Sequence, residues 1–445
     1  MPTPPTGTAA YSYDDAPLRP FHVRVAIASL GGVFSDGYGL GIVGISLAQA
    51  TDALELTPLW LGLLGGAALA GLFLGALLTG PAADQLGRRP IYAYNMLALA
   101  VCAGLQFFVQ SSGQLLVLRF VIGFLLGTDY VVSKALLVEF TPLRLRGRVL
   151  GTLSIAWAGG YACAYLVGFG LSDLGPAAWR WMLASSLVPC LLILPLRWRL
   201  PESPLWLGSH GRANLAAEVV ARWIGIDVRP PRAASAALSR RGRWSQLFSP
   251  QWRRNTIVGA VFFTCQVIPY FAVGTFVKQV LDSLHVANSA VGGIAYNVAL
   301  LAGSVLGVLV VDHLPRRTFL VGSFGVTALA LVPLLLLEAP GAAVIVPSFV
   351  VFAGVLSAAA SLCYVYLPEL FPTDLRASGI GLAIASSRIG SAVSTFLLPL
   401  VVSLYSVQAA LGACAAVLGL GAALCYAWAP ETRNQPLDSM TPETT

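Results

Sequence analysis

Apolar runs of about twenty residues recur along the whole chain, and no other feature limits its fold as strongly. A run of this length, wound as an α-helix, can cross the hydrocarbon core of a bilayer. Only 11% of the residues are charged, whereas a soluble domain usually carries roughly 25%. The chain is therefore predicted to be an all-α membrane protein with the lipid bilayer as its partner and no soluble domain of ordinary size.

The apolar runs predict twelve membrane-spanning helices, six on each side of a long polar segment. In the first half we expect helices near residues 24–46, 58–80, 90–110, 114–137, 149–171 and 178–198. In the second half we expect them near 255–281, 289–311, 318–338, 342–365, 378–403 and 406–429. The predicted organisation is an N-terminal tail (1–23), a six-helix bundle (24–198), a central loop (199–254), a second six-helix bundle (255–429) and a C-terminal tail (430–445).

The two halves repeat each other in sequence. The polar decapeptide GPAADQLGRR, which begins at Gly80, returns in the second half as VLVVDHLPRR, which begins at Val308. Two further echoes follow in the same order, EFTPLRLRG with ELFPTDLRASG, and Pro-Glu-Ser with Pro-Glu-Thr. Three ordered echoes indicate a duplicated chain, in which two six-helix halves form a parallel repeat.

The positive charge is concentrated in alternate connections between the apolar runs. This placement follows the positive-inside rule and predicts that these connections and both termini are cytoplasmic. The net charge of +7 is thus explained by topology, and we expect no nucleic-acid partner. The seven cysteines lie within or at the edge of apolar runs, where a disulfide framework is not expected.

The central loop combines a short stretch that is compatible with a helix and a basic, proline-containing stretch, RPPRAASAALSRRGRW. We expect it to be a tether between the halves. A short amphipathic helix on the anionic inner leaflet is compatible with the same residues, and a regulatory binding segment is the remaining alternative.

At its repeated segments the chain resembles the major facilitator superfamily. GPAADQLGRRP resembles the loop between helices 2 and 3 of that superfamily. RFVIGFLLGTDY, EFTPLRLRG, PESPLWL, PELFPTDLRASG and PETRN resemble its branch of sugar porters and metabolite:proton symporters. The resemblance extends from the first helix to Pro430, and it implies the major facilitator fold, alternating access and a small-molecule substrate bound between the halves.

The resemblance also implies a cytoplasmic gate at the repeated loops. Asp84 would accept hydrogen bonds from helix-terminal N–H groups, and arginines would pair with carboxylates at neighbouring helix ends. These pairs would hold the cytoplasmic side shut and break when it opens; the alternative is that the arginines only set topology. Pro315 replaces the glycine found at Gly87, so we expect a weaker second copy. The gate residues would be Asp84, Arg88, Arg89, Glu139, Arg146, Glu202, Asp312, Arg316, Arg317, Glu369, Arg376 and Glu431.

Few ionisable residues lie within the apolar runs, and each suggests a function because burial in hydrocarbon is costly. Asp36 lies near the middle of the first helix, where loss of water favours the protonated acid and makes it a candidate proton carrier; the alternative is an ion-paired structural carboxylate. Gly39 stands where proton-coupled sugar porters have a carboxylate, and Arg119 matches the arginine that partners this carboxylate in the family. Asp129 resembles an acid of phosphate-type symporters; a second proton or substrate site, or a pair with Lys134 or Arg119, is expected. The proton-coupling set is Asp36, Arg119 and Asp129.

Arg388 lies deep in the eleventh predicted helix, where a fixed cation suits a carboxylate or phosphate group. The alternative is a buried ion pair with an acid of the same half. Polar and aromatic side chains of neighbouring helices could complete a cavity, although such aromatic residues more commonly serve packing. The predicted substrate-binding set is Tyr38, Lys134, Trp157, Tyr161, Gln266, Tyr270, Asn297, Tyr364 and Arg388.

Together these features predict a monomeric secondary active transporter of the inner membrane, which couples protons to the movement of a small polar metabolite, with an organic anion favoured. A sugar or polyol carrier, working by symport or uniport, is the first alternative. Efflux of a self-made metabolite or a drug, and a non-transporting nutrient receptor, are the others. No Walker loop, paired zinc ligands or nucleophile elbow occurs, so we expect no enzymatic activity, no cofactor and no metal.

Overall fold

A computed structural model describes residues 11–231, 244–286, 288–337, 340–371 and 373–433. Within these ranges, twelve helices are long and apolar enough to cross a membrane. The described residues form no sheet, and their only strand-like pairing is an isolated bridge between Tyr11 and Val228. The protein is therefore an all-α membrane protein with the predicted number of spans.

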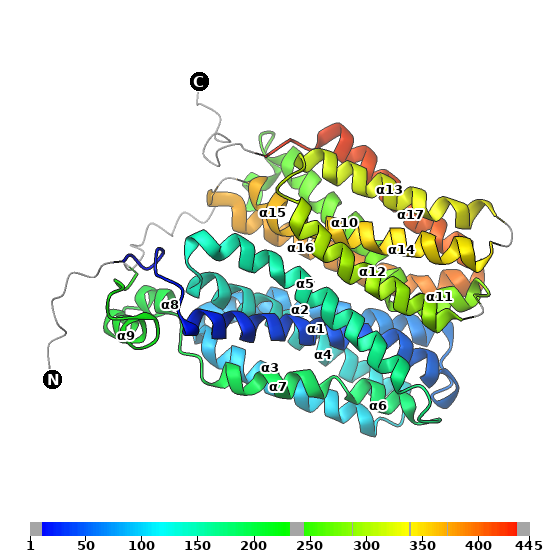
Figure 1. Cartoon of the computed structure of the whole chain (residues 1–445), viewed down its shortest axis with the longest axis horizontal. Helices are drawn as coiled ribbons and strands as arrows, with labels where there is room; N and C mark the ends of the chain where they lie inside the picture. The colour runs from blue at the N-terminus through cyan, green and yellow to red at the C-terminus, as the bar shows by residue number, and fades with distance from the viewer. Residues whose placement is uncertain (1–10, 232–243, 287, 338–339, 372, 434–445) are drawn as a thin grey trace.

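Figure 1 shows the two halves as separate layers of helices that run along the long axis of the molecule. The first half contains α1 (Pro20–Ala53), α2 (Pro58–Leu86), α3 (Arg88–Leu105), the short η1 (Gln106–Phe108), α4 (Ser112–Phe140), α5 (Leu143–Gly170), α6 (Ala178–Ala184) and α7 (Leu187–Trp198). The second half contains α10 (Arg253–Thr275), α11 (Val277–Ser283), α12 (Ser289–Val310), α13 (Arg316–Leu336), α14 (Ala342–Ala359), α15 (Leu362–Glu369), α16 (Thr373–Leu404) and α17 (Val407–Trp428). Three spans are each built from two successive helices, α3 with η1, α6 with α7, and α14 with α15.

Close helix contacts in both halves depend on glycine. A Cβ atom on Gly71 of α2 would overlap with the carbonyl oxygen of Phe120 in α4. In the second half a Cβ atom on Gly303 of α12 would overlap with the carbonyl oxygen of Gly354 in α14. Small residues let helix backbones approach closely in membranes, where burial of apolar side chains offers little driving force. Close packing at a glycine thus joins the second and fourth spans in each half, as expected for a duplicated chain.

The halves touch each other most closely at one end of the molecule, here called the closed end. A Cβ atom on Gly44 of α1 would overlap with the carbonyl oxygen of Thr275, and one on Gly62 of α2 with that of Phe396 in α16. The opposite end carries Arg88 and is here called the arginine end. Helices α2 and α16 therefore meet at the closed end, whereas further along they line a cavity.

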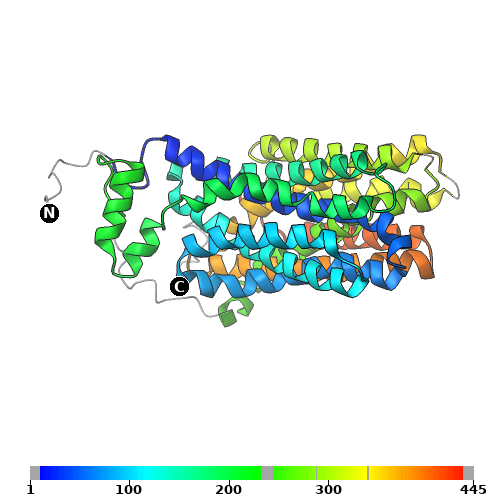
Figure 2. The same ribbon diagram turned by 90° about the horizontal axis from the view of Figure 1, so that it is seen from below.

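The central segment is partly folded. It contains α8 (Pro204–Ser209), α9 (Ala213–Val219), the π-helical η2 (Val220–Ile224) and η4 (Trp244–Phe248). Figure 2 shows α8 and α9 projecting beyond the membrane-spanning helices near the N-terminus. The N-terminal tail holds this part to the first half, because Arg19 at the start of α1 forms an ion pair with Asp227 at 2.7 Å. Residues 204–228 are thus a docked helical element rather than a simple tether, whereas most of the basic stretch predicted as a linker lies outside the described residues.

Candidate functional site

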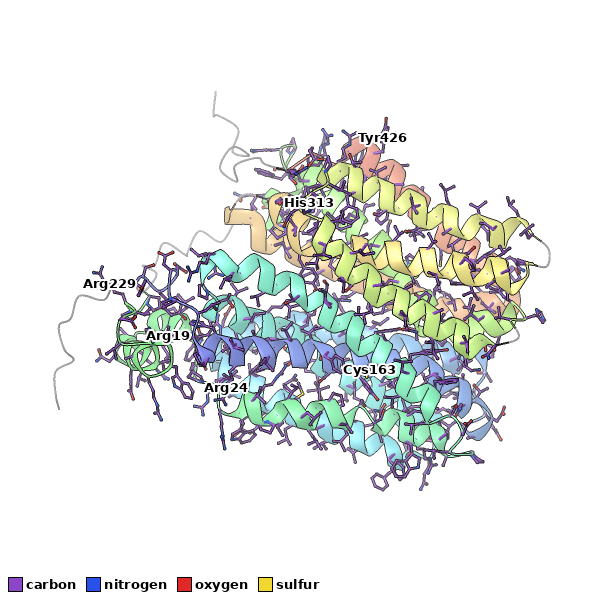
Figure 3. The ribbon with its side chains drawn as sticks, in the orientation of Figure 1. Arg19, Arg24, Cys163, Arg229, His313 and Tyr426 are labelled. Carbon is purple, nitrogen blue, oxygen red and sulfur yellow. The ribbon has the colours of Figure 1, made fainter. Side chains whose placement is uncertain are left out.

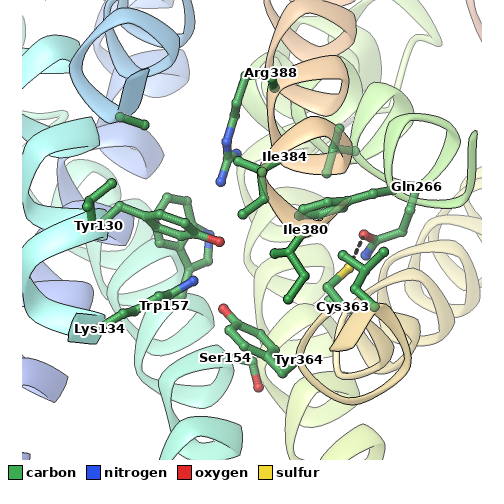
Figure 4. A pocket seen from close by; sticks show the side chains of 18 of the residues that line it. Tyr130, Lys134, Ser154, Trp157, Gln266, Cys363, Tyr364, Ile380, Ile384 and Arg388 are labelled. Atoms are coloured by element: carbon green, nitrogen blue, oxygen red, sulfur yellow. Dashed lines mark hydrogen bonds between the residues drawn. The ribbon is translucent and has the colours of Figure 1, made fainter. Parts of the chain in front are cut away.

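A cavity of about 540 Å³ lies between the halves. Its walls come from α2, α4 and α5 on one side and from α10, α12, α14, α15 and α16 on the other. Figure 4 shows the side chains of both halves facing each other across it. Val138 and Pro368, which directly precede the gate residues Glu139 and Glu369, are part of its wall, so the cavity extends to the arginine end.

Two cations face each other across this cavity. Arg388 of α16 is 4% exposed, and its guanidinium carbon lies 5.2 Å from the ring centre of Tyr130 and 5.8 Å from that of Phe271. The Lys134 ammonium of α4 lies 3.3 Å from the ring centre of Tyr130 and 4.8 Å from that of Tyr364. Neither cation has a carboxylate partner in the described part of the chain. Aromatic side chains therefore hold both charges, and the Nε of Arg388 has no hydrogen-bond partner among the described residues.

Among the described residues, the wall contains no Asp or Glu, and apart from the two cations it is aromatic, apolar or neutral-polar. Gln266 of α10 is the main neutral-polar group. Its amide donates to the carbonyl oxygen of Leu356 at 3.3 Å and accepts from the thiol of Cys363 at 3.3 Å. The site is thus a positively charged pocket with an aromatic lining.

Six predicted substrate-binding residues lie in this wall: Lys134, Trp157, Gln266, Tyr270, Tyr364 and Arg388. The other three do not. The Tyr38 hydroxyl is 2.7 Å from the Ser185 hydroxyl, inside the first half. The Asn297 amide donates to the carbonyl oxygen of its own helix at Gly293, 2.8 Å away, and Tyr161 is 1% exposed and packs against α1 at Gly41. Tyr130 and Cys363, which the sequence analysis did not select, belong to the wall.

Asp129 points away from the cavity, into the core of the first half. Its carboxylate forms an ion pair with Arg197 of α7, and both side chains are fully buried. Ser133 donates to the same carboxylate at 2.9 Å, and the Arg197 guanidinium lies 4.0 Å from the ring centre of Tyr92. The expected partners Lys134 and Arg119 were wrong, because α7 carries Arg197 into the core, where it pairs with Asp129.

Asp36 and Arg119 lie in the same half but form no ion pair with each other. Asp36 is 1% exposed, and neither carboxylate oxygen has a hydrogen-bond partner among the described residues. The Arg119 guanidinium donates to the backbone carbonyl of Gly39 at 3.2 Å. A Cβ atom on Gly39 would meet nothing within 4 Å. The position of the family's helix-1 carboxylate is therefore open space beside a buried arginine.

The first predicted gate cluster is assembled at the arginine end. The Arg88 guanidinium lies 3.2 Å from the Asp84 carboxylate and 3.1 Å from that of Glu139. Glu202 accepts from the backbone N–H groups of Arg88 and Arg89, both at 3.1 Å, and so caps the start of α3. The capping role assigned to Asp84 therefore belongs to Glu202.

The second cluster repeats the first nearly atom for atom. Arg316 lies 3.6 Å from Asp312 and 3.3 Å from Glu369, and Glu431 accepts from the backbone N–H groups of Arg316 and Arg317 at 2.8 and 3.0 Å. Pro315 has a φ of −57°, where Gly87 has +94°, so the turn differs as expected. Every contact of the first copy is nevertheless present, because Glu431 reaches the same N–H groups. Burial opposes ionisation of Glu431, but the N–H groups of Arg433, Arg317 and Arg316 hold its pKa below the ordinary value.

Both clusters are confined to their own half. None of the ion pairs between described residues joins one half to the other, and both clusters are intact although the cavity reaches their end of the molecule. The pairs of Arg88 and Arg316 thus lie within one half, and their breaking when this end opens remains a prediction. Arg146 pairs with Asp14 of the N-terminal tail at 3.7 Å, and the side chain of Arg376 lies outside the described part of the chain.

The side-chain view in Figure 3 locates Arg19, at the start of α1, beside the docked central segment. These contacts tie the tail and residues 204–228 to the first half, whereas η4 is held to the second half by Thr256 of α10, which donates to the carbonyl oxygen of Leu247 at 2.8 Å. They leave the cavity as the one place in the described structure where uncompensated charge faces an open volume between the halves.

The family profile described as "Sugar (and other) transporter" matches residues 25–443. The chain belongs to this family. It is 39% identical to the inner membrane metabolite transport protein YgcS of Escherichia coli over 430 residues, which cover 97% of this chain and 96% of that protein. It is 36% identical to the putative metabolite transport protein YaaU of the same organism, over 96% of each chain. The xylose transporter XylE of E. coli, in a partially occluded inward-open structure, superposes with a TM-score of 0.77 at 19% identity, covering 94% of this chain and all of XylE.

The resemblance to the sugar-porter branch of the major facilitator superfamily is thereby confirmed, together with its fold. The protein is a multi-pass membrane transporter of metabolites or sugars and not an enzyme.

Proposed function

We propose that this transporter is a secondary active carrier for a small organic anion, a carboxylate with an apolar or aromatic body. One observation carries this proposal: Lys134 and Arg388 face the cavity from opposite halves, and no carboxylate lies in the described wall. A planar guanidinium binds a carboxylate through two parallel N–H···O bonds, and a lysine adds a mobile point charge. An anionic substrate would therefore supply the negative charge that the cavity lacks.

The body of the substrate would lie on the aromatic wall. Trp157, Tyr270, Phe271 and Tyr364 offer apolar faces, which fit a ring or a short hydrocarbon chain better than a fully hydroxylated sugar. Relatives named as a niacin transporter (28% identical) and a benzoate transport protein (24%) support an aromatic acid, whereas another named as a glucose transporter (26%) does not. These names alone do not decide between a carboxylic acid and a sugar as the substrate. The positive charge of the cavity favours the carboxylic acid.

Proton coupling would use Asp36. An ionised carboxylate without any hydrogen bond is strongly disfavoured at a buried position, so Asp36 would hold a proton in this conformation. Asp129 is compensated by Arg197 and is therefore the weaker candidate. In the proposed cycle Asp36 takes up a proton from outside and the anion binds to Arg388. The closed end then forms, and both are released at the arginine end, which would face the cytoplasm.

Proteoliposomes test the proposal directly. Uptake of radiolabelled benzoate and nicotinate, driven by an acidic exterior, is expected for the wild type and lost in Arg388→Gln. In Asp36→Asn the response to the pH gradient should disappear, whereas counterflow of unlabelled for labelled acid continues. Uptake of xylose or glucose that is unchanged in Arg388→Gln, with no uptake of any acid, would overturn the anion proposal.

A neutral sugar remains the second candidate because of Gln266. Its amide lies in the wall together with Ser154, Ser304 and Ser357, and these groups could bind hydroxyls. In that case Gln266→Leu would abolish sugar uptake and Arg388→Gln would spare it. The same two variants thus separate the two candidates.

A further inference from the structure

The buried Arg197 lies against α1 one helical turn from Asp36. Gly32, four residues before Asp36, makes this possible: a Cβ atom there would overlap with the Nη2 of Arg197 and would lie 2.9 Å from the Oδ2 of Asp129. Residues four apart lie on the same face of a helix. The guanidinium is therefore packed on the same face of α1 that carries the unpartnered carboxyl of Asp36.

Asp36 has few charged neighbours. Helix α4 contributes Asp129 and Lys134, and α7 contributes Arg197 and the thiol of Cys190. Helix α5 meets α1 at Gly37 with the backbone of Trp157, and the neutral Ser185, directly after α6, is hydrogen-bonded to Tyr38. Of the two cations, Lys134 faces the cavity, whereas Arg197 is enclosed in the core.

Asp129 has other donors besides Arg197. Ser133 donates to its Oδ2 at 2.9 Å, and the Asn95 amide lies 3.5 Å from its Oδ1. The guanidinium also has other contacts: its Nε lies 3.4 Å from the carbonyl oxygen of Ala28, and its plane lies on the ring of Tyr92. A rotation of Arg197 toward Asp36 would therefore leave neither group without a partner.

We propose that Arg197 is a positioning residue shared by two carboxylates. It pairs with Asp129 while Asp36 is protonated, and it turns to bind Asp36 when that group releases its proton. The step is balanced: the O–H bond of Asp36 breaks, the proton leaves to solvent water, and the new carboxylate accepts an N–H bond from Arg197. This inference rests on the proposed function, since it explains how the buried Asp36 could give up the proton that coupling requires.

The test measures proton binding without a substrate. Infrared difference spectra of the full-length protein in lipid follow the C=O band of a protonated carboxylic acid as the pH is raised, and the band missing in Asp36→Asn belongs to Asp36. If no such band exists in the wild type, Asp36 is not the proton site and the inference fails with it. Loss of acid uptake together with an intact band would instead refute the substrate proposal alone.

The decisive variant is the charge-neutral double substitution Asp129→Asn with Arg197→Gln. A shared Arg197 stabilises the Asp36 carboxylate, so its removal should move the loss of the band to higher pH. If Arg197 serves Asp129 alone, the double substitution should instead move the loss of the band to lower pH, because the repulsion between Asp129 and the Asp36 carboxylate is removed. Loss of the band at an unchanged or lower pH would therefore overturn the inference. Arg197→Lys, which keeps the charge, should remain closer to the wild type than Arg197→Gln.

Neighbouring glycines supply a milder test if the double variant fails to fold. Gly32→Ala places a methyl group where Arg197 lies, whereas Gly31→Ala places one against the side chain of Ile193. Both substitutions crowd the contact between α1 and α7, one at the side chain of Arg197 and the other at that of Ile193. A shift of the Asp36 band to higher pH in Gly32→Ala but not in Gly31→Ala supports the shared arginine, and equal behaviour of the two variants contradicts it.

Discussion

Replacement of Glu202 by alanine should destabilise the first half of the transporter without changing which end is open. The Glu202 carboxylate accepts the first two backbone N–H groups of α3, each at 3.1 Å, and Gly87 directly before them has a φ of +94° that brings the chain under this carboxylate. A Cβ atom on Gly87 would lie 2.5 Å from the Glu202 Oε2. The contacts lie within one half, so they act as a helix cap and not as a bond between the halves.

The magnitude follows from the two hydrogen bonds. Loss of a helix N-cap costs about 0.5–2 kcal/mol, and loss of a negative charge at a helix N-terminus costs a further 0.3–1 kcal/mol, roughly. We expect a total of about 2 kcal/mol for Glu202→Ala and about half of this for Glu202→Gln, which keeps one acceptor oxygen. For a unit of the size of one half, this corresponds to a fall in Tm of about 4–8 °C.

The assay is thermal unfolding of the purified protein, followed by intrinsic fluorescence, with accessibility of Cys363 to a thiol reagent as the readout of the open end. Glu218→Ala on α9 is the matched control, because Glu218 is exposed and should change Tm by less than about 2 °C. A Tm for Glu202→Ala equal to that of the control would refute the cap. Altered labelling of Cys363 at unchanged Tm would show instead that Glu202 acts between the halves.

Three further predictions follow from the same geometry. Arg388→Lys keeps the charge but loses the planar fork, so we expect the Kd for an acid substrate to rise about tenfold, and a Kd equal to that of the wild type would speak against bidentate binding. Gly62→Leu should prevent close contact with Phe396 and expose the closed end to external thiol reagents, whereas Gly113→Leu, whose Cβ position is free, should not. Because N–H groups hold the pKa of Glu431 below its ordinary value, its contribution to stability is present at neutral pH and lost as the pH falls through the folded-state pKa. The difference in Tm between wild type and Glu431→Gln should therefore shrink on acidification, and a constant difference would contradict the capping role.

The two gate clusters could be predicted because their residues repeat along the chain in the same order. Asp84 with Arg88 and Asp312 with Arg316 are both separated by one helical turn, and this local spacing is visible in a sequence. Whether these ion pairs join the two halves could not be predicted from the sequence. That they remain within one half depends on where the helix ends lie in space, which no local pattern reports.

The charged residues of the cavity could be predicted from the sequence, because a charge within an apolar run is itself unusual. Lys134 and Arg388 stood out as cations in apolar runs, and both face the cavity. Tyr130 was missed because it follows Asp129, and neighbouring residues on a helix point in different directions, one into the core and one into the cavity. Tyr38 was misplaced for a related reason, since its side chain points into the first half, where its hydroxyl meets that of Ser185.

Arg197 shows most clearly what could not be predicted from the sequence. Its place near the end of the sixth span is typical of a loop arginine under the positive-inside rule, yet its side chain reaches the core and pairs with Asp129. The depth of α7, and with it the partner of Asp129, depends on contacts between distant helices. Long-range packing of this kind leaves no trace in the spacing of residues along one helix.

The most direct test of the account is a binding panel in which each carboxylic acid is paired with its neutral amide. Thermal stabilisation of the purified transporter would be measured with benzoate and benzamide, nicotinate and nicotinamide, and with xylose and glucose, since a ligand stabilises the state that it binds. We expect at least one acid to stabilise the wild type, its amide to have no effect, and Arg388→Gln to abolish the stabilisation. Stabilisation by a sugar or an amide that persists in Arg388→Gln, with none by any acid, would contradict the claim that this cavity selects an anion.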